Sequence, residues 1–86
     1  MKTFTVQYKK SSEKDIERLP ADFVQRIRDA ILGLSQNPRP TGCKKLKGFE
    51  NKYRIRVGDY RVIYEIHEKT VVVLIVQISH RKDAYR

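Results

Sequence analysis

The residues with the clearest chemical potential are three arginines in residues 52–66. Apolar and charged residues alternate on either side of Gly58 and Asp59, which is the period of two half-buried β-strands. A two-residue loop at this point, with glycine supplying the positive φ, closes the strands into a hairpin and sets Arg56 directly opposite Arg61. Like charges that face each other in a ladder destabilise it. Together with Arg54 on the same side, this pair therefore indicates a surface that binds an anion.

More basic residues lie on both sides of this hairpin in the chain: Lys44, Lys45, Lys47, His80, Arg81 and Lys82. Clustering of basic side chains on one face is typical of nucleic-acid binding. The alternative for the arginines is that they simply spread into solvent. The lysines before the hairpin have an alternative too, because natural sheets place lysine on edge strands to block aggregation. An edge position and an RNA contact are compatible with each other.

The overall charge favours a polyanionic partner. The chain has 19 Lys and Arg against 10 Asp and Glu, for a formal net charge of +9, which suits RNA, DNA or an acidic protein without choosing among them. The single cysteine, Cys43, excludes an internal disulfide and fits a reducing compartment. No apolar run approaches the roughly 20 residues of a membrane span, and the amino terminus lacks a signal peptide. We therefore expect a cytoplasmic protein with no membrane partner.

The carboxyl-terminal segment adds groups that could move protons. His80, Arg81 and Tyr85 place an imidazole, a guanidinium and a phenol within the six residues 80–85, just beyond the predicted last strand. The sequence has no metal-ligand spacing, phosphate loop or nucleophile motif, so we expect neither a metal nor a cofactor. RNA cleavage suits such a set, because the ribose 2′-hydroxyl is an internal nucleophile and guanidinium groups can neutralise the charge that develops on phosphorus. The alternative for His80 and Tyr85 is capping and packing at the end of the chain.

The rest of the sequence predicts the elements that position these residues within one domain, residues 1–86. Residues 3–8 alternate as a strand, Ser11 or Ser12 caps a short helix, and Pro20 opens a second helix. The second helix has one apolar stripe, formed by Phe23, Ile27, Ala30, Ile31 and Leu34.

Beyond a turn-rich connection at residues 37–42, three further expectations concern packing and register. Leu46 and Phe49 are expected to anchor in the core, and residues 71–78 are apolar enough for a strand buried on both faces. If Glu68 and Lys69 form the loop before this strand, continued alternation puts His80 on the face that carries Arg56 and Arg61.

Three segments together, residues 44–48 (KKLKG), 53–66 and 80–85 (HRKDAY), resemble the RelE/ParE superfamily of bacterial toxins. The similarity extends over essentially the whole chain. It implies an α+β fold in which two N-terminal helices pack on one face of a small, mainly antiparallel twisted sheet, in the order β-α-α-β-β-β. It also implies a cognate antitoxin that masks the basic surface, with operator DNA reached only through that antitoxin. RelE-type members cleave messenger RNA in the ribosomal A site, beside ribosomal RNA, by attack of the 2′-hydroxyl on the adjacent phosphate.

The resemblance also assigns roles to the site residues. The family's catalytic set matches Arg54, Arg56, Arg61, Arg81 and Tyr85, with His80 beside them, and the RNA-binding lysines would be Lys44, Lys45, Lys47 and Lys82. One departure is that arginine stands at 54 and 56 where a well-known member has lysine. Arginine is effectively never deprotonated, so general-base work shifts to His80, Tyr85 or the ribosome. The alternatives are a ParE-like inhibitor of DNA gyrase and a catalytically silent member.

Overall fold

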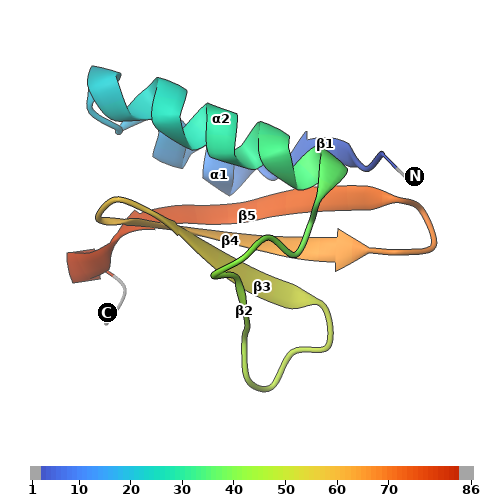
Figure 1. Cartoon of the computed structure of the whole chain (residues 1–86). Coiled ribbons are helices and arrows are strands. Elements are labelled where there is room, and N and C mark those ends of the chain that lie inside the picture. Colours follow the sequence, from blue (N-terminus) through green and yellow to red (C-terminus); the bar gives the residue numbers. More distant parts are fainter. Residues whose placement is uncertain (1–2, 84–86) are drawn as a thin grey trace.

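The computed structural model describes residues 3–83 as a five-stranded sheet with two helices on one face (Figure 1). The elements follow one another as β1 (Thr5–Tyr8), α1 (Lys10–Glu17), α2 (Ala21–Gln36), β2 (Lys44–Lys45), β3 (Lys52–Val57), β4 (Tyr60–His67), β5 (Val72–His80) and a 3-10 helix, η1 (Arg81–Asp83). The strand order across the sheet is β1-β5-β4-β3-β2. Among the strand pairs within residues 3–83, β1–β5 is parallel and the others are antiparallel. The predicted α+β fold is confirmed, and the structure adds the two-residue strand β2 to the expected order.

The helices form the upper layer and supply much of the core. Pro20 immediately precedes α2, as predicted, whereas α1 begins after Lys9 and not after a capping serine. Ser12 is instead buried, and its hydroxyl donates to the Lys9 carbonyl at 2.7 Å. Ser11 donates to the Val76 carbonyl at 3.0 Å, which ties α1 to β5. The two serines therefore bond the start of α1 to Lys9 and to β5, and neither caps the helix.

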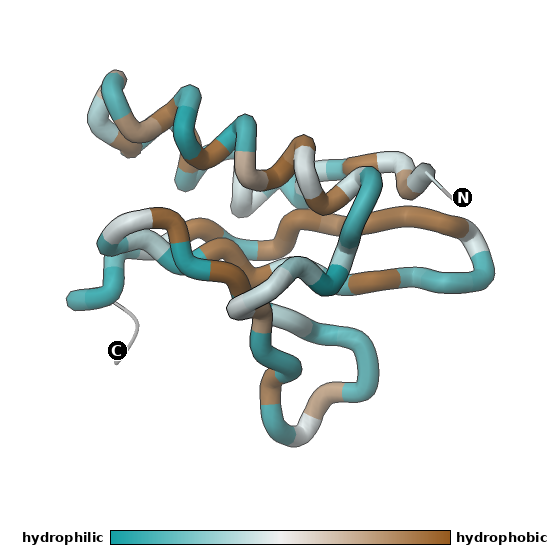
Figure 2. Tube along the Cα trace, in the orientation of Figure 1, coloured by the Kyte–Doolittle hydropathy of each residue, from teal (hydrophilic) through white to brown (hydrophobic). Residues whose placement is uncertain are grey.

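The predicted stripe of α2 packs on the sheet. Ile27, Ile31 and Leu34 are at most 1% exposed. Across from them the sheet contributes its own fully buried side chains: Val62, Tyr64, Val73 and Ile75. Figure 2 shows hydrophobic residues recurring along α2 above a long hydrophobic run in β5. These buried side chains form the core between the helices and the sheet, so the buried residues of a strand face the helices and the alternate residues face away.

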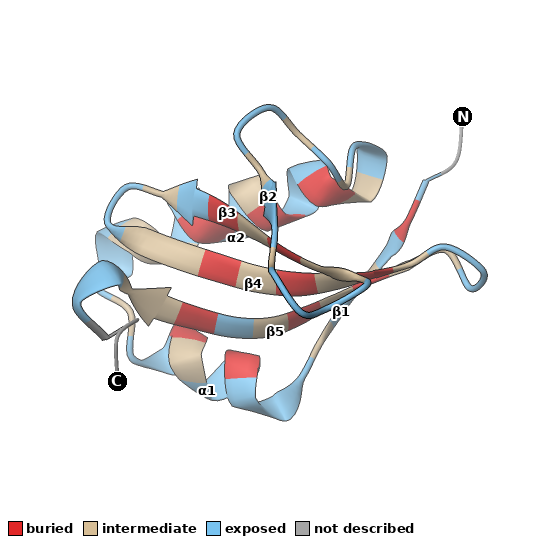
Figure 3. Ribbon diagram, turned by 90° about the horizontal axis from the view of Figure 1, so that it is seen from below, coloured by how far each residue is buried: buried red, intermediate tan, exposed pale blue. Residues whose placement is uncertain are grey.

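Burial in β5 alternates, so the expectation of a strand covered on both faces was wrong. Val73, Ile75 and Ile78 are buried, whereas Gln77 is exposed and the remaining residues are only half-buried. Both helices lie on the same side, as Figure 3 shows from the opposite side, and neither covers the other face.

Two tyrosines fasten the connection between α2 and β2 to the sheet. The Tyr64 hydroxyl donates to the Pro38 carbonyl at 2.7 Å, and Arg39 donates to the Tyr53 hydroxyl at 3.3 Å and to Glu68 at 2.8 Å. Burial raises the pKa of the Tyr64 phenol well above its usual value near 10. These bonds form a polar clasp on the covered side of the arginine hairpin, partly buried at the tyrosines and exposed at Arg39 and Glu68.

The loop between β2 and β3 differs from expectation. Leu46 is half-buried but is not among the described residues that form the core or pack against it, and Phe49 is 49% exposed, so the prediction that both anchor in the core was wrong. None of the helices within residues 3–83 is long and apolar enough to cross a membrane.

Candidate nucleic-acid interface

The β3–β4 hairpin places its arginines on the uncovered face of the sheet. Gly58 has φ of 58° and starts the two-residue turn, Val57 pairs with Tyr60, and Arg56 pairs directly with Arg61, all as predicted. The turn requires glycine for a second reason, because a Cβ at position 58 would lie 3.0 Å from the Phe23 ring. The like-charged pair is thus a fixed feature of the ladder.

The η1 segment brings two further cations to this hairpin. The Arg81 backbone N–H donates to the Asp59 carbonyl at 2.8 Å, and the Arg81 side chain lies 3.7 Å from the Asp59 carboxylate. The Lys82 N–H donates to His80 Nδ1 at 3.2 Å. The two Arg81–Asp59 contacts attach the end of β5 to the hairpin turn, so residues 20 or more positions apart in sequence share one surface. Asp59 was missed in the sequence, where the only hint was an acid in the turn of a strongly basic hairpin.

Four cationic side chains line an open pocket of about 430 Å³: Arg56, Arg61, Arg81 and Lys82. Guanidinium groups stay charged in proteins and present several N–H donors in a planar fork, which matches phosphate oxygens. An anion bound here would relieve the mutual repulsion of these side chains. The arrangement can therefore bind a phosphate and stabilise extra negative charge on it.

Arg54 and the lysines extend the same charged surface. Arg54 lies two residues before Arg56, so it shares that face, and it pairs with Lys44 of β2. Lys45 pairs with Tyr53. Lys44, Lys45 and Lys47 are all exposed. The edge-strand interpretation of Lys44 and Lys45 is confirmed, and their contact with RNA stays a prediction.

His80 lies on the other side of the sheet, so its predicted position beside Arg56 and Arg61 was wrong. Between β4 and β5 the pairing shifts from Tyr64–Ile75 to Ile63–Gln77, which leaves Val76 as an extra, bulged residue. The loop before β5 is also longer than expected, because His67 pairs with Val72. As a result Tyr60 pairs with His80, and it is Ser79 that pairs with Arg61.

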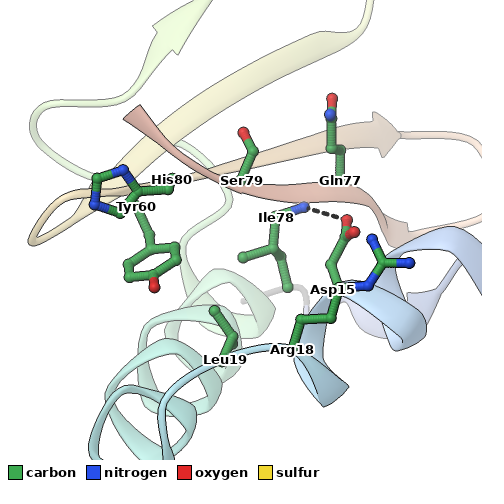
Figure 4. Close-up of a pocket in the computed structure, with 8 residues that line it drawn as sticks. All are labelled: Asp15, Arg18, Leu19, Tyr60, Gln77, Ile78, Ser79 and His80. Carbon is green, nitrogen blue, oxygen red and sulfur yellow. Dashed lines mark hydrogen bonds between the residues drawn. The ribbon is translucent and has the colours of Figure 1, made fainter. Parts of the chain in front are cut away.

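His80 lines a different pocket, of about 340 Å³, at the corner between α1 and β5 (Figure 4). His80 makes an edge contact with Tyr60, with ring centroids 5.2 Å apart. Asp15 accepts a hydrogen bond from the Ile78 N–H at 2.9 Å. In Figure 4, Gln77 and Ser79 point away from the helices whereas Ile78 points toward them. Because His80 pairs with Tyr60 whereas Arg61 pairs with Ser79, His80 belongs to the helix-covered face and the arginines of the cationic pocket belong to the uncovered face.

Tyr85, the remaining predicted catalytic residue, lies outside the described residues, and its role stays a prediction. Thus the structure unites Arg56, Arg61, Arg81 and Lys82, places Arg54 beside them, and separates His80 from them.

The chain is similar to known toxins over nearly its whole length. Residues 6–85 match the family described as the ParE toxin of the type II toxin-antitoxin system parDE. Toxin RelE3 of Methanocaldococcus jannaschii is 34% identical, with 93% of each chain covered. The toxin in the crystal structure of the archaeal RelE–RelB complex from Pyrococcus horikoshii is 32% identical, with a TM-score of 0.83 over 95% of this chain and 99% of that chain. The intact E. coli RelBE complex, at 19% identity and a TM-score of 0.79 over 90% of this chain and 95% of that chain, shares the fold.

Proposed function

Because the chain belongs to the RelE/ParE superfamily of toxins from type II toxin-antitoxin systems, we propose that it cleaves messenger RNA in the ribosomal A site. The observation that carries this proposal is the convergence of Arg56, Arg61, Arg81 and Lys82 around one pocket. A phosphodiester seated there would be surrounded by fixed positive charge. Pre-positioned charge of this kind lowers the barrier to reactions in which negative charge develops on phosphorus.

In the proposed reaction the 2′-hydroxyl of one ribose attacks the adjacent phosphorus. The bond from phosphorus to the 5′-oxygen of the next nucleotide breaks, which leaves a 2′,3′-cyclic phosphate and a 5′-hydroxyl. The proton of the 2′-hydroxyl passes to a base, and the leaving 5′-oxygen takes up a proton. This reaction needs no metal or cofactor, because the arginines stabilise the negative charge that develops on the phosphate.

The proton transfers need groups other than the arginines of the pocket. Arginine is effectively always protonated, and the imidazole of His80 lies on the opposite face of the sheet. Glu65 shares the uncovered face, but it is four residues from Arg61 and so about 13 Å away along the strand. We therefore assign proton transfer to Tyr85 or to groups of the ribosome. If ribosomal groups supply it, cleavage would occur only on the ribosome.

A cognate antitoxin is the second proposed partner. The solved relatives from Pyrococcus horikoshii and Methanococcus jannaschii are RelE proteins in complex with RelB antitoxins. A chain with a net charge of +9 and a cationic pocket suits an acidic partner that covers the uncovered face. Such a partner would neutralise the toxin in the cytoplasm and would carry it to operator DNA.

The second candidate function is inhibition of DNA gyrase, which the ParE description of the matching family supports. A gyrase inhibitor acts through protein contacts and has no need of a phosphate pocket. The four converging cations favour the ribonuclease.

The deciding experiment is incubation of the protein with translating ribosomes, followed by mapping of messenger ends, beside a gyrase supercoiling assay. We expect cuts within A-site codons, with 2′,3′-cyclic phosphate and 5′-hydroxyl ends, and unchanged supercoiling. Intact messenger together with inhibited supercoiling would contradict the proposal, and so would cuts that leave a 5′-phosphate.

A further inference from the structure

The loop between β2 and β3 presents an aromatic ring to solvent. Phe49 is 49% exposed, and within the described residues the only other exposed large hydrophobic side chain is Leu32 of α2. In Figure 1 this loop projects from the sheet on the side away from the helices. Single exposed apolar residues are common, so exposure alone assigns no role to Phe49.

The loop is nevertheless an ordered turn. The Phe49 N–H donates to the Leu46 carbonyl at 3.4 Å, and Gly48 at the third position of this turn has φ of 84°, as in a type II turn. The Leu46 N–H donates to the Lys52 carbonyl at 2.9 Å and closes the loop. A third bond of 2.9 Å, from the Ile66 N–H to the Asn51 carbonyl, ties the loop to β4. The backbone thus holds the ring outside the core.

The surroundings of the ring are cationic. The Lys52 ammonium lies 4.4 Å from the Phe49 ring centroid. Residues 44–52 contain four lysines and one glutamate, a net charge of +3 (4 − 1). An exposed ring with one ammonium against it and further lysines close by in the chain has the composition of a site for single-stranded nucleic acid, where a base stacks on the ring and lysines neutralise the neighbouring phosphates. A protein partner would need a broader apolar patch than one ring among charged residues.

We propose that Phe49 is a stacking platform for an unpaired RNA base, and that Lys47 and Lys52 bind the flanking phosphates. This inference rests on the proposed function in that both concern RNA, but it assigns a docking site outside the cationic pocket. The loop would hold the RNA while the arginines act on another phosphate. Phe49 would contribute to binding and not to the chemical step.

The test is a binding titration with a fluorescently labelled single-stranded oligoribonucleotide of about ten nucleotides at low salt, with fluorescence anisotropy as the readout. Loss of one stacked base weakens binding by about 5- to 150-fold, so we expect this loss for Phe49→Ala. Phe49→Trp should bind at least as well as the wild type, because it keeps an aromatic face. Phe49→Leu should be nearly as weak as Phe49→Ala, because leucine is apolar but has no ring face. Leu32→Ala, the matched control on α2, should bind like the wild type.

Several results would overturn the proposal. These are wild-type affinity in Phe49→Ala, full retention of binding in Phe49→Leu, an equal loss in Leu32→Ala, or no binding by the wild type at low salt. If Phe49→Ala binds RNA normally but no longer retains the purified antitoxin, the loop docks a protein and the proposal is wrong. The assay measures binding and not cleavage, so the two proposals can fail separately. If the protein does not cleave RNA but binds it through Phe49, the cleavage proposal fails and this one stands.

Discussion

The two faces of the sheet differ in what they contribute, although the same strands supply both. On the covered face, Val62 is completely buried under the helices, whereas the next residue back, Arg61, lines a cationic pocket on the uncovered face. Alternation along a strand thus assigns neighbouring residues to stability or to ligand binding. A single bulged residue is enough to exchange the two assignments, as His80 shows. Substitutions on the two faces should therefore have separable effects.

The largest effect is expected on the covered face. Ile75→Ala should lower the free energy of unfolding by about 2–5 kcal/mol, because it leaves a cavity in a fully buried position. Gln77→Ala, two residues along the same strand but exposed, should change it by no more than about 0.5 kcal/mol. Urea unfolding followed by circular dichroism measures both. Equal losses would remove the distinction between the faces.

On the uncovered face, Arg61→Ala should reduce messenger cleavage by on the order of a hundredfold or more, as loss of one pre-positioned charge donor does. The fold should persist, because Arg61 is only half-buried. Single-turnover cleavage on ribosomes gives the rate, and the urea midpoint gives the stability. Arg28→Ala, an exposed arginine of α2, is the matched control and should cleave normally. A folded Arg61→Ala that cleaves at the wild-type rate would remove Arg61 from the mechanism.

A smaller effect is expected at the edge of the sheet. A triple variant in which alanine replaces Lys44, Lys45 and Lys47 should bind RNA more weakly than the wild type. The slope of log binding constant against log salt concentration should become shallower by about 2, at about 0.7 for each lost phosphate contact. Titrations at several salt concentrations measure the slope. An unchanged slope would limit these lysines to protection of the edge strand.

The smallest effect is expected at the clasp behind the hairpin. Tyr64→Phe removes the hydrogen bond to the Pro38 carbonyl and should cost about 1 kcal/mol at neutral pH. The raised pKa of Tyr64 also predicts a pH dependence, because folding favours the protonated phenol. Its contribution is complete below the ordinary pKa near 10 and is lost as pH rises above it. Stability of the wild type should therefore fall more steeply above pH 10 than that of Tyr64→Phe, and equal slopes would contradict the assignment.

How much the sequence predicts differs between the two hairpins. The β3–β4 hairpin was predictable to the residue, because strict alternation and a glycine turn fix its register. The β4–β5 hairpin was not, because β5 is apolar at almost every position and carries no alternation to set the register. Its bulge at Val76 lies beside tertiary contacts of Ser11 and Asp15 with β5, which no local pattern in β5 predicts.

The candidate site, like the fold, could be predicted only where a local sequence pattern sets the strand register. The arginine pair could be predicted from local pattern, but the attachment of Arg81 to Asp59 and the separation of His80 depend on that register. Phe49 was assigned to the core on hydrophobicity alone, whereas the glycine turn at residues 46–49 holds it in solvent.

The most direct test compares Arg81 with His80, two adjacent residues that belong to opposite faces. Single-turnover messenger cleavage on ribosomes should fall by on the order of a hundredfold in Arg81→Ala. It should fall by less than about tenfold in His80→Ala, because the contact of His80 with a residue of the cationic pocket is the hydrogen bond from the Lys82 N–H. A larger loss in His80→Ala than in Arg81→Ala would place the chemistry on the covered face and contradict the account.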